Sequence, residues 1–178
     1  MFNKKMENIL NDVENKFIVL GGRPEVEKTT MAFKIAESFA QGNNTVAVFS
    51  AGKTSDDVRG KISLDGVKLT FEGENDVSAS DISNKVKEIK RDNDLKLVVV
   101  DYKEESNDNN ERNLLFTNLR TTCDELNVKF LVTTPVSDRM IGKENLSIGD
   151  LFNKNDIAAK VADKIIFLEN EEAFKVMK

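Results

Sequence analysis

The 178-residue sequence has no histidine, no tryptophan and a single cysteine, Cys123. One cysteine excludes a disulfide within the chain, and the lack of histidine excludes a histidine-ligated metal site and a histidine-based catalytic triad. Cys123 stands among Leu119, Leu126 and Val128 in a helix-like stretch. We therefore expect a packed thiol at this position rather than a reactive one.

Positive charge and long apolar runs are also scarce. The formal net charge is -5 at pH 7, which argues against a strongly basic nucleic-acid surface. No apolar run is long enough to cross a bilayer, and the first residues form no apolar signal core. We therefore expect a cytoplasmic protein that does not contact membranes. The length favours one domain, residues 16–178, preceded by a short amphipathic helix within residues 1–15.

Apolar runs typical of strands alternate with amphipathic stretches typical of helices. The expected strands are 16–20, 45–49, 67–71, 95–100, 128–133 and 164–168. The expected helices are 3–14, 29–41, one beginning at Thr54, 80–91, 111–126 and part of 147–162. Such alternation is typical of crossover connections between parallel strands. It predicts an α/β fold with a doubly wound, mostly parallel sheet covered by helices on both faces.

Residues 17–30 read as an apolar strand, a loop and the start of a helix. The phosphate-binding loop pattern is Gly, four residues, Gly, Lys and Ser or Thr, and Gly22, Lys28 and Thr29 stand in register with it. Backbone amides and a helix N-terminus attract phosphate oxygens in such a loop, and Lys28 would reach the outer phosphates. The residues predicted to contact nucleotide here are Gly22, Arg23, Glu27, Lys28, Thr29 and Thr30.

A second half of the same site is indicated where the most apolar strand, 95–100, ends in Asp101. In P-loop enzymes an acid in this position holds the magnesium ion together with the hydroxyl group of the loop. We therefore predict that Thr29 and Asp101 ligate Mg²⁺ and that Asp101 completes the nucleotide site. ATP and Mg²⁺ are the cofactors that this pair of motifs indicates.

Glu27 stands where the pattern has its second glycine. That glycine lets the backbone approach the phosphates closely, whereas a carboxylate about 5 Å from a phosphate charge costs roughly 3 kcal/mol at an effective dielectric near 20. Two arrangements are open from the sequence. In the first, the loop has lost its function and Glu27 forms an ion pair with Lys28 or Arg23. In the second, the Glu27 carboxylate occupies the phosphate-binding position and mimics the missing anion. In both, we expect nucleotide binding to be weak or lost.

With both motifs placed, the segment from Lys16 to Glu172 resembles the C-terminal ATPase domain of DnaB-type replicative helicases. The family's loop typically reads Arg-Pro-Ser-Met-Gly-Lys-Thr-Thr, and residues 23–30 read Arg-Pro-Glu-Val-Glu-Lys-Thr-Thr. The resemblance implies a RecA-like P-loop NTPase fold. Further segments similar to the family are 97–102, with its tyrosine after the aspartate, 125–128, 150–151 and 162–168.

The departures from the family lie along the path of ATP hydrolysis. The family's catalytic glutamate follows the second strand, where this chain has Gly52, and its γ-phosphate-sensing glutamine is replaced by Thr134-Pro135. The family's arginine finger lies beyond the counterpart of Lys178, and its N-terminal domain and linker helix precede the part that matches. The resemblance therefore implies a chain without these parts, in which catalysis is lost.

The expected role is a non-catalytic binding or regulatory module linked to DNA replication, docked on a helicase or RecA-like ATPase or forming a homo-oligomer. The first alternative is a slow ATPase that binds Mg-ATP weakly and acts in an oligomer. The second is a single-stranded DNA binder. The family's DNA loops correspond to parts of 103–110, which is acidic here, and 137–149, which keeps Arg139 and Lys143. We therefore expect DNA binding not to be strong.

Overall fold

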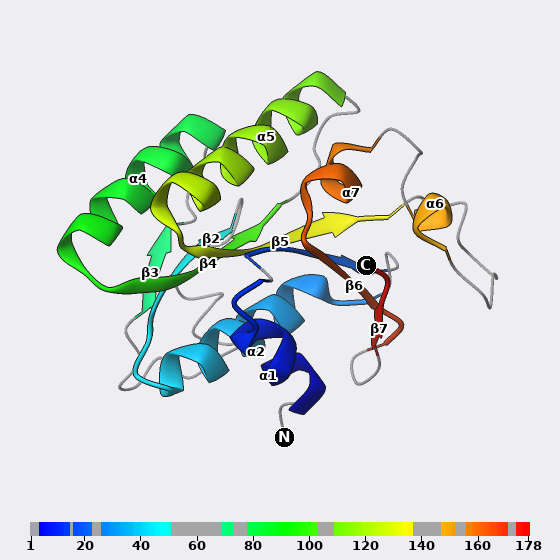
Figure 1. The fold of residues 1–178 in the computed structure, drawn as a ribbon, viewed down its shortest axis with the longest axis horizontal. Helices are drawn as coiled ribbons and strands as arrows, with labels where there is room; N and C mark the ends of the chain where they lie inside the picture. The colour runs from blue at the N-terminus through cyan, green and yellow to red at the C-terminus, as the bar shows by residue number, and fades with distance from the viewer. Residues whose placement is uncertain are drawn as a thin grey trace.

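A sheet of seven strands forms the centre of the computed structural model, which describes residues 4–14, 16–22, 26–50, 69–72, 78–102, 109–136, 147–151, 156–170 and 174–178 (Figure 1). The strands are β1 Phe17–Gly22, β2 Thr45–Ser50, β3 Leu69–Glu72, β4 Leu95–Asp101, β5 Lys129–Pro135, β6 Lys164–Leu168 and β7 Phe174–Val176. Their order is β3-β2-β4-β5-β1-β6-β7, and only β7 pairs antiparallel among these described strands. Strand β5 therefore separates β1 from β4, the two strands that carry the predicted motifs.

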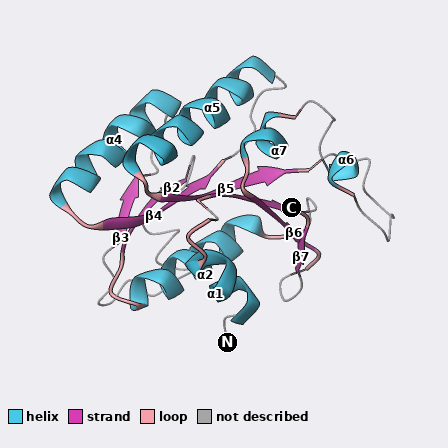
Figure 2. Ribbon diagram, in the orientation of Figure 1, coloured by secondary structure: helices cyan, strands magenta, loops and turns pink. Residues whose placement is uncertain are grey.

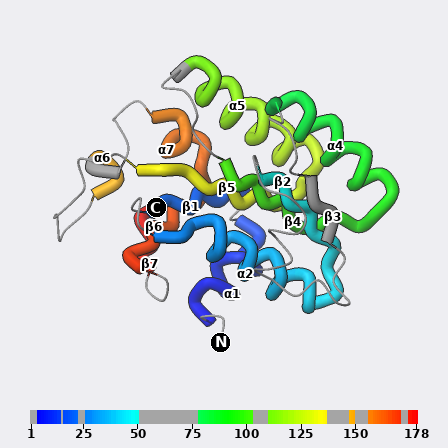
Figure 3. The backbone as a smooth tube through the Cα atoms, turned by 180° about the vertical axis from the view of Figure 1, so that it is seen from behind, coloured from blue at the N-terminus to red at the C-terminus, as the bar shows by residue number. Residues whose placement is uncertain are grey.

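Helices cover both faces of this sheet (Figures 1 and 2). They are α1 Lys4–Asn11, α2 Lys28–Gln41, α4 Ala79–Asp92, α5 Asn109–Leu126, α6 Ile148–Leu151 and α7 Ile157–Val161. Helices α1 and α2 lie on one face and α4, α5 and α7 on the other, as the view from behind also shows (Figure 3). The predicted α/β fold with a doubly wound, mostly parallel sheet is confirmed. No described helix has the length and apolar content needed to cross a membrane.

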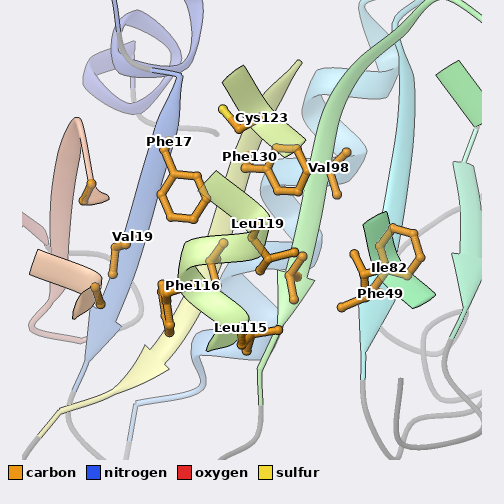
Figure 4. Close-up of a cluster of buried hydrophobic side chains, with 14 of the residues drawn as sticks. Phe17, Val19, Phe49, Ile82, Val98, Leu115, Phe116, Leu119, Cys123 and Phe130 are labelled. Carbon is orange, nitrogen blue, oxygen red and sulfur yellow. The ribbon is translucent and has the colours of Figure 1, made fainter. Parts of the chain in front are cut away.

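The alternation of side chains along the strands gives the sheet two separate hydrophobic cores. In β1, Phe17 and Val19 face α5, whereas Ile18 and Leu20 face α2. Figure 4 shows Phe17 close to residues of α5 and β5 in the first core. Cys123 is fully buried in the same core, and this burial raises the pKa of its thiol to about 11. The predicted packing of this thiol is confirmed.

Helix α1 packs next to α2 on the same face of the sheet. Its Met6, Ile9 and Leu10 recur three and four residues apart, so they share one face of the helix. All three are buried in the core that α2 forms with the sheet. The N-terminal amphipathic pattern thus serves to cover this core rather than to project from it.

Several element bounds differ from the sequence predictions. Strand β5 does not end at Thr133 but continues to Pro135, because a proline is tolerated at the end of a strand, where its missing N–H takes no part in the ladder. The short edge strand β7 is not among the predicted strands; it is only three residues long and none of them is fully buried, so it leaves no apolar run. The helix expected from Thr54 lies outside the described residues.

The carboxylate of Asp163 lies at the edge of the sheet where the parallel strands β1 and β6 begin, and it accepts hydrogen bonds there. Its Oδ2 accepts hydrogen bonds from the backbone N–H groups of Lys16 (3.1 Å) and Phe17 (2.8 Å). It also accepts one from the Arg120 guanidinium over 2.8 Å. Partial burial by itself would raise the pKa of Asp163, but these hydrogen bonds outweigh it and hold the pKa below its ordinary value near 3.8. The ionised form therefore stabilises the start of β1.

We expect this carboxylate to make stability fall in acid. Because the native state holds the pKa of Asp163 below its unfolded value, its contribution is complete above about pH 4 and is lost as the pH falls through the folded pKa. Urea unfolding at several pH values should show Asp163→Asn less stable than the parent at pH 7, with the gap closing toward pH 3. Glu7→Gln, which changes an exposed carboxylate of α1, is the control. A gap that does not change with pH would contradict this role.

Candidate functional site

The candidate site lies at the carboxyl ends of three neighbouring strands, β2, β4 and β5. The register places Ser50 beside Asp101 and Asp101 beside Thr133. Because side chains alternate along a strand, all three face the side of the sheet on which α2 packs. Ligand sites of open parallel sheets lie at this edge. The fold therefore gathers three polar side chains close to the point where α2 begins.

The Asp101 carboxylate accepts hydrogen bonds from three hydroxyl groups. Thr29, in the first turn of α2, places its Oγ1 3.0 Å from Oδ1 and 2.9 Å from Oδ2. Ser50 donates to Oδ2 over 2.8 Å and Thr133 to Oδ1 over 2.9 Å. The predicted metal-ligating residues, Thr29 and Asp101, are thus in direct contact although 72 positions separate them in the chain.

The loop between β1 and α2 begins at Gly22 and reaches the helix at Lys28. The Lys28 ammonium donates to the carbonyl oxygens of Gly22 over 3.3 Å and Val26 over 3.5 Å, so it bridges the two ends of the loop. A Cβ at Gly22 would lie 3.1 Å from Cγ of Lys28, which explains why a glycine suits this position. Pro135 is aligned with Gly22 across the β1–β5 pair. Arg23, also predicted to contact nucleotide, lies outside the described residues.

Glu27 immediately precedes the first residue of α2. Its carboxylate accepts a hydrogen bond from the Thr30 hydroxyl, and its carbonyl oxygen accepts one from Met31 N–H over 3.2 Å. The side chain is exposed and lies against the first turn of the helix. Thr30 is not among the partners that the sequence suggests for Glu27. The contact places a negative charge at the helix N-terminus, where a phosphate would otherwise be attracted.

A buried ion pair lies on the opposite face of the same end of β5. Arg112, 6% exposed, donates to the Thr134 hydroxyl over 2.7 Å and to the two carboxylate oxygens of Asp156 over 3.1 and 3.2 Å. Its guanidinium lies over the ring of Phe116, 4.9 Å from the ring centre. Asp156 also caps α7 by accepting Ala158 N–H over 2.8 Å. The cluster thus joins α5, β5 and α7.

Sequence reasoning does not identify Ser50, Thr133 or Arg112 as parts of this region. Ser50 and Thr133 do carry a local signal, because each is a polar residue at the end of an apolar run. That signal acquires meaning only when the strand order makes them neighbours of Asp101. Arg112 has no such signal, since an arginine near the start of a polar helix is usually exposed.

The oxygen donors of this site suit a small hard cation better than a polyphosphate chain. Carboxylate and hydroxyl oxygens are ligands that Mg²⁺ accepts, and Thr29 and Asp101 would hold it. Within the described residues there is no group of three or more acidic, histidine or cysteine side chains, so the site has one carboxylate supported by hydroxyls. The phosphate side fits less well, because the Glu27 carboxylate already lies at the N-terminus of α2.

Comparisons with known proteins identify the fold. No protein-family model and no curated protein matches this sequence. Among solved structures, one described as an "ATPase Domain" superposes with a TM-score of 0.76 at 17% identity, covering 89% of this chain and 71% of that one. "The Structure Of A DnaB-Like Replicative Helicase And Its Interactions With Primase" superposes with a TM-score of 0.73 at 18% identity and covers 90% of this chain. This chain spans 48% of that helicase.

These structures confirm the predicted fold, that of the RecA-like ATPase domain of DnaB-like helicases. At 17–18% identity the likeness shows the fold alone, because one fold carries many functions. What the site does has to be argued from its residues.

Proposed function

We propose that this RecA-fold domain is a non-catalytic binding or regulatory module linked to DNA replication, in which nucleotide binding is weakened. The observation that carries the proposal is the position of Glu27, whose carboxylate lies at the N-terminus of α2, where it accepts a hydrogen bond from Thr30. This is the point to which a P-loop domain attracts phosphate. A scaffold of the DnaB type is kept while its anion site carries a fixed negative charge.

The magnitude of the electrostatic effect supports weakened binding. One like-charge pair about 5 Å apart costs roughly 3 kcal/mol at an effective dielectric near 20, which is on the order of a hundredfold in affinity. Lys28 offsets part of this cost, but its ammonium is shared with the carbonyl oxygens of Gly22 and Val26. A nucleotide would have to draw the lysine away from both.

The replacement of groups that would carry out hydrolysis supports a non-catalytic role. Pro135, beside Gly22 at the edge of the site, has no side-chain donor with which to sense a γ-phosphate. Gly52, where the family's base would stand, lies outside the described residues and has no group that could take a proton. Two independent losses at the reacting end of the nucleotide favour a domain that no longer turns over ATP.

The partner that we propose is a helicase or another RecA-like ATPase, which would be met through the surface that related domains use between subunits. The DnaB-like helicase described above was solved together with its interactions with primase, and this chain has the fold of part of that helicase. A homo-oligomer of this chain is the other form that such a surface allows. The domain would then act by binding within an assembly rather than by powering that assembly through ATP hydrolysis.

The alternative function is a weak Mg-ATP-dependent ATPase, and one observation favours it. Thr29 and Asp101 are in contact, and two further hydroxyls donate to Asp101, which is the arrangement that would hold Mg²⁺. A partner could supply the groups that this chain lacks.

We expect the parent protein to release no phosphate above background from Mg-ATP and to bind a fluorescent ATP analogue no more tightly than high micromolar. Fluorescence anisotropy and a phosphate-release assay on the same preparation measure both. Lys28→Ala provides the background, because it removes the charge that any phosphate would use. Micromolar binding together with Lys28-dependent turnover would contradict the non-catalytic role and establish the ATPase alternative.

A further inference from the structure

We propose that Ser50 and Thr133 are positioning residues that fix the Asp101 carboxylate so that, with Thr29, it binds a magnesium-sized cation without requiring nucleotide. The proposal rests on the proposed function only in taking Asp101 as the metal side of that site. It assigns a role to two side chains that the P-loop pattern does not include.

The two residues hold the two oxygens of the carboxylate separately. Ser50, from β2, donates to Oδ2, and Thr133, from β5, donates to Oδ1. They flank Asp101 on the two neighbouring strands, and both are only 1% exposed. The plane of the carboxylate is therefore fixed by donors on rigid strands and not by a loop.

The direction of the Thr133 hydroxyl is itself fixed. Its Oγ1 accepts the backbone N–H of Tyr102 over 3.0 Å while it donates to Asp101. A hydroxyl has one proton to give, so a chain of donors runs from Tyr102 through Thr133 to Oδ1. Thr133 thus holds Asp101 but is poorly placed to become a metal ligand.

Thr29 differs from Ser50 and Thr133, because its hydrogen bond to Asp101 is the one that a cation could replace. Its one proton is shared between both oxygens of Asp101, and the residue is half-buried at the start of α2 rather than fully buried in a strand. A cation that arrives between Thr29 and Asp101 would replace this shared hydrogen bond by two metal–oxygen contacts. The bonds from Ser50 and Thr133 would stay in place and keep the carboxylate in its orientation.

The ligand set fits a small, strongly hydrated ion. Mg²⁺ keeps several of its waters and is bound through about one or two carboxylates, whereas Ca²⁺ takes about six to eight oxygen ligands. Thr29 and Asp101 offer one hydroxyl and one carboxylate, which lie in direct contact. A site with so few protein ligands should select Mg²⁺ and Mn²⁺ over Ca²⁺.

Binding of Mn²⁺ alone, followed by electron paramagnetic resonance, tests the proposal on the whole chain. The specific site is the part of the binding that Asp101→Asn removes, which separates it from adventitious binding by surface carboxylates. Thr133→Val and Ser50→Ala should each weaken this part about tenfold or more, as loss of outer hydrogen bonds does in other metal sites. Thr133→Ser keeps the hydroxyl and should restore the affinity of the parent.

Thr122→Val is the matched control, because Thr122 is also buried and hydrogen-bonded but lies between α4 and α5. It should lower stability without changing Mn²⁺ affinity.

Mg²⁺ should displace Mn²⁺ at lower concentration than Ca²⁺. Parent-like affinity in folded Ser50→Ala and Thr133→Val would overturn the positioning role, and the absence of Asp101-dependent Mn²⁺ binding would overturn the site. Ser50→Ala is the smaller change and decides the matter if Thr133→Val does not fold. Since no nucleotide is present, failure of the nucleotide proposal would leave this result unaffected.

Discussion

Replacing Glu27 by glycine should tighten the binding of Mg-ATP about a hundredfold. The substitution removes a carboxylate from the N-terminus of α2, and with it a like-charge repulsion of roughly 3 kcal/mol at an effective dielectric near 20. Glycine at this position also lets the backbone approach an incoming phosphate more closely. The Thr30 hydroxyl, which donates to Glu27 in the parent, becomes available to the ligand. Titration of a fluorescent ATP analogue into both proteins measures the change.

Two further variants separate charge from backbone access. Glu27→Gln removes the charge but keeps a side chain, so an equal gain from glutamine and glycine would assign the whole effect to the charge. Glu37→Gln removes a carboxylate from the same helix about 15 Å further along its axis and should leave affinity unchanged. If Glu27→Gly binds no better than the parent, Glu27 is not what weakens the site.

Replacing Arg112 by methionine should lower the free energy of unfolding by about 3 kcal/mol. The change leaves Asp156 and the Thr134 hydroxyl without the guanidinium that pairs them, and removing one partner of a buried ion pair typically costs about 3–5 kcal/mol. The lower end applies because the Asp156 side chain is 17% exposed and keeps its bond to the α7 backbone. Methionine retains contact with Phe116, so the loss reports mainly on the charge.

Arg91→Met is the matched control for this measurement. Arg91 pairs with Asp92 over 2.9 Å, but both side chains are exposed, at 73% and 56%. Exposed pairs contribute little to stability, because solvent screens the two charges. Urea unfolding should therefore show a large shift of the midpoint for Arg112→Met and almost none for Arg91→Met. Equal shifts would mean that burial does not determine the contribution of Arg112.

The parallel sheet could be predicted because each buried strand is a short apolar run with a helix after it. The predicted strand 164–168 has the observed bounds, and the predicted strands 95–100 and 45–49 each lack one residue. Those missing residues are Asp101 and Ser50, polar side chains that end the apolar run but still pair in the ladder. The short edge strand β7 has no such run, because antiparallel pairing at an edge buries little side chain.

The site was predictable only as far as one segment of chain determines it. Lys28 and Thr29 follow from the loop pattern, and Asp101 follows from a strand that ends in an acid. The support of Asp101 by Thr133 could not be predicted, because it depends on β5 lying between β1 and β4, and strand order is a property of the whole fold. The same applies to the contact between Arg112 and Asp156, which joins two helices through residues that are 44 positions apart.

Thr133 and Thr134, near the end of β5, make hydrogen bonds on opposite faces of the sheet. Thr133 is bonded to Asp101 on the α2 side and Thr134 to Arg112 on the α5 side, and a single peptide unit joins them. Neighbouring substitutions that share a backbone segment do not add their energies. The hydrogen bonds around Asp101 and the Arg112–Asp156 ion pair should therefore be energetically coupled, so that a substitution at one of them changes the effect of a substitution at the other.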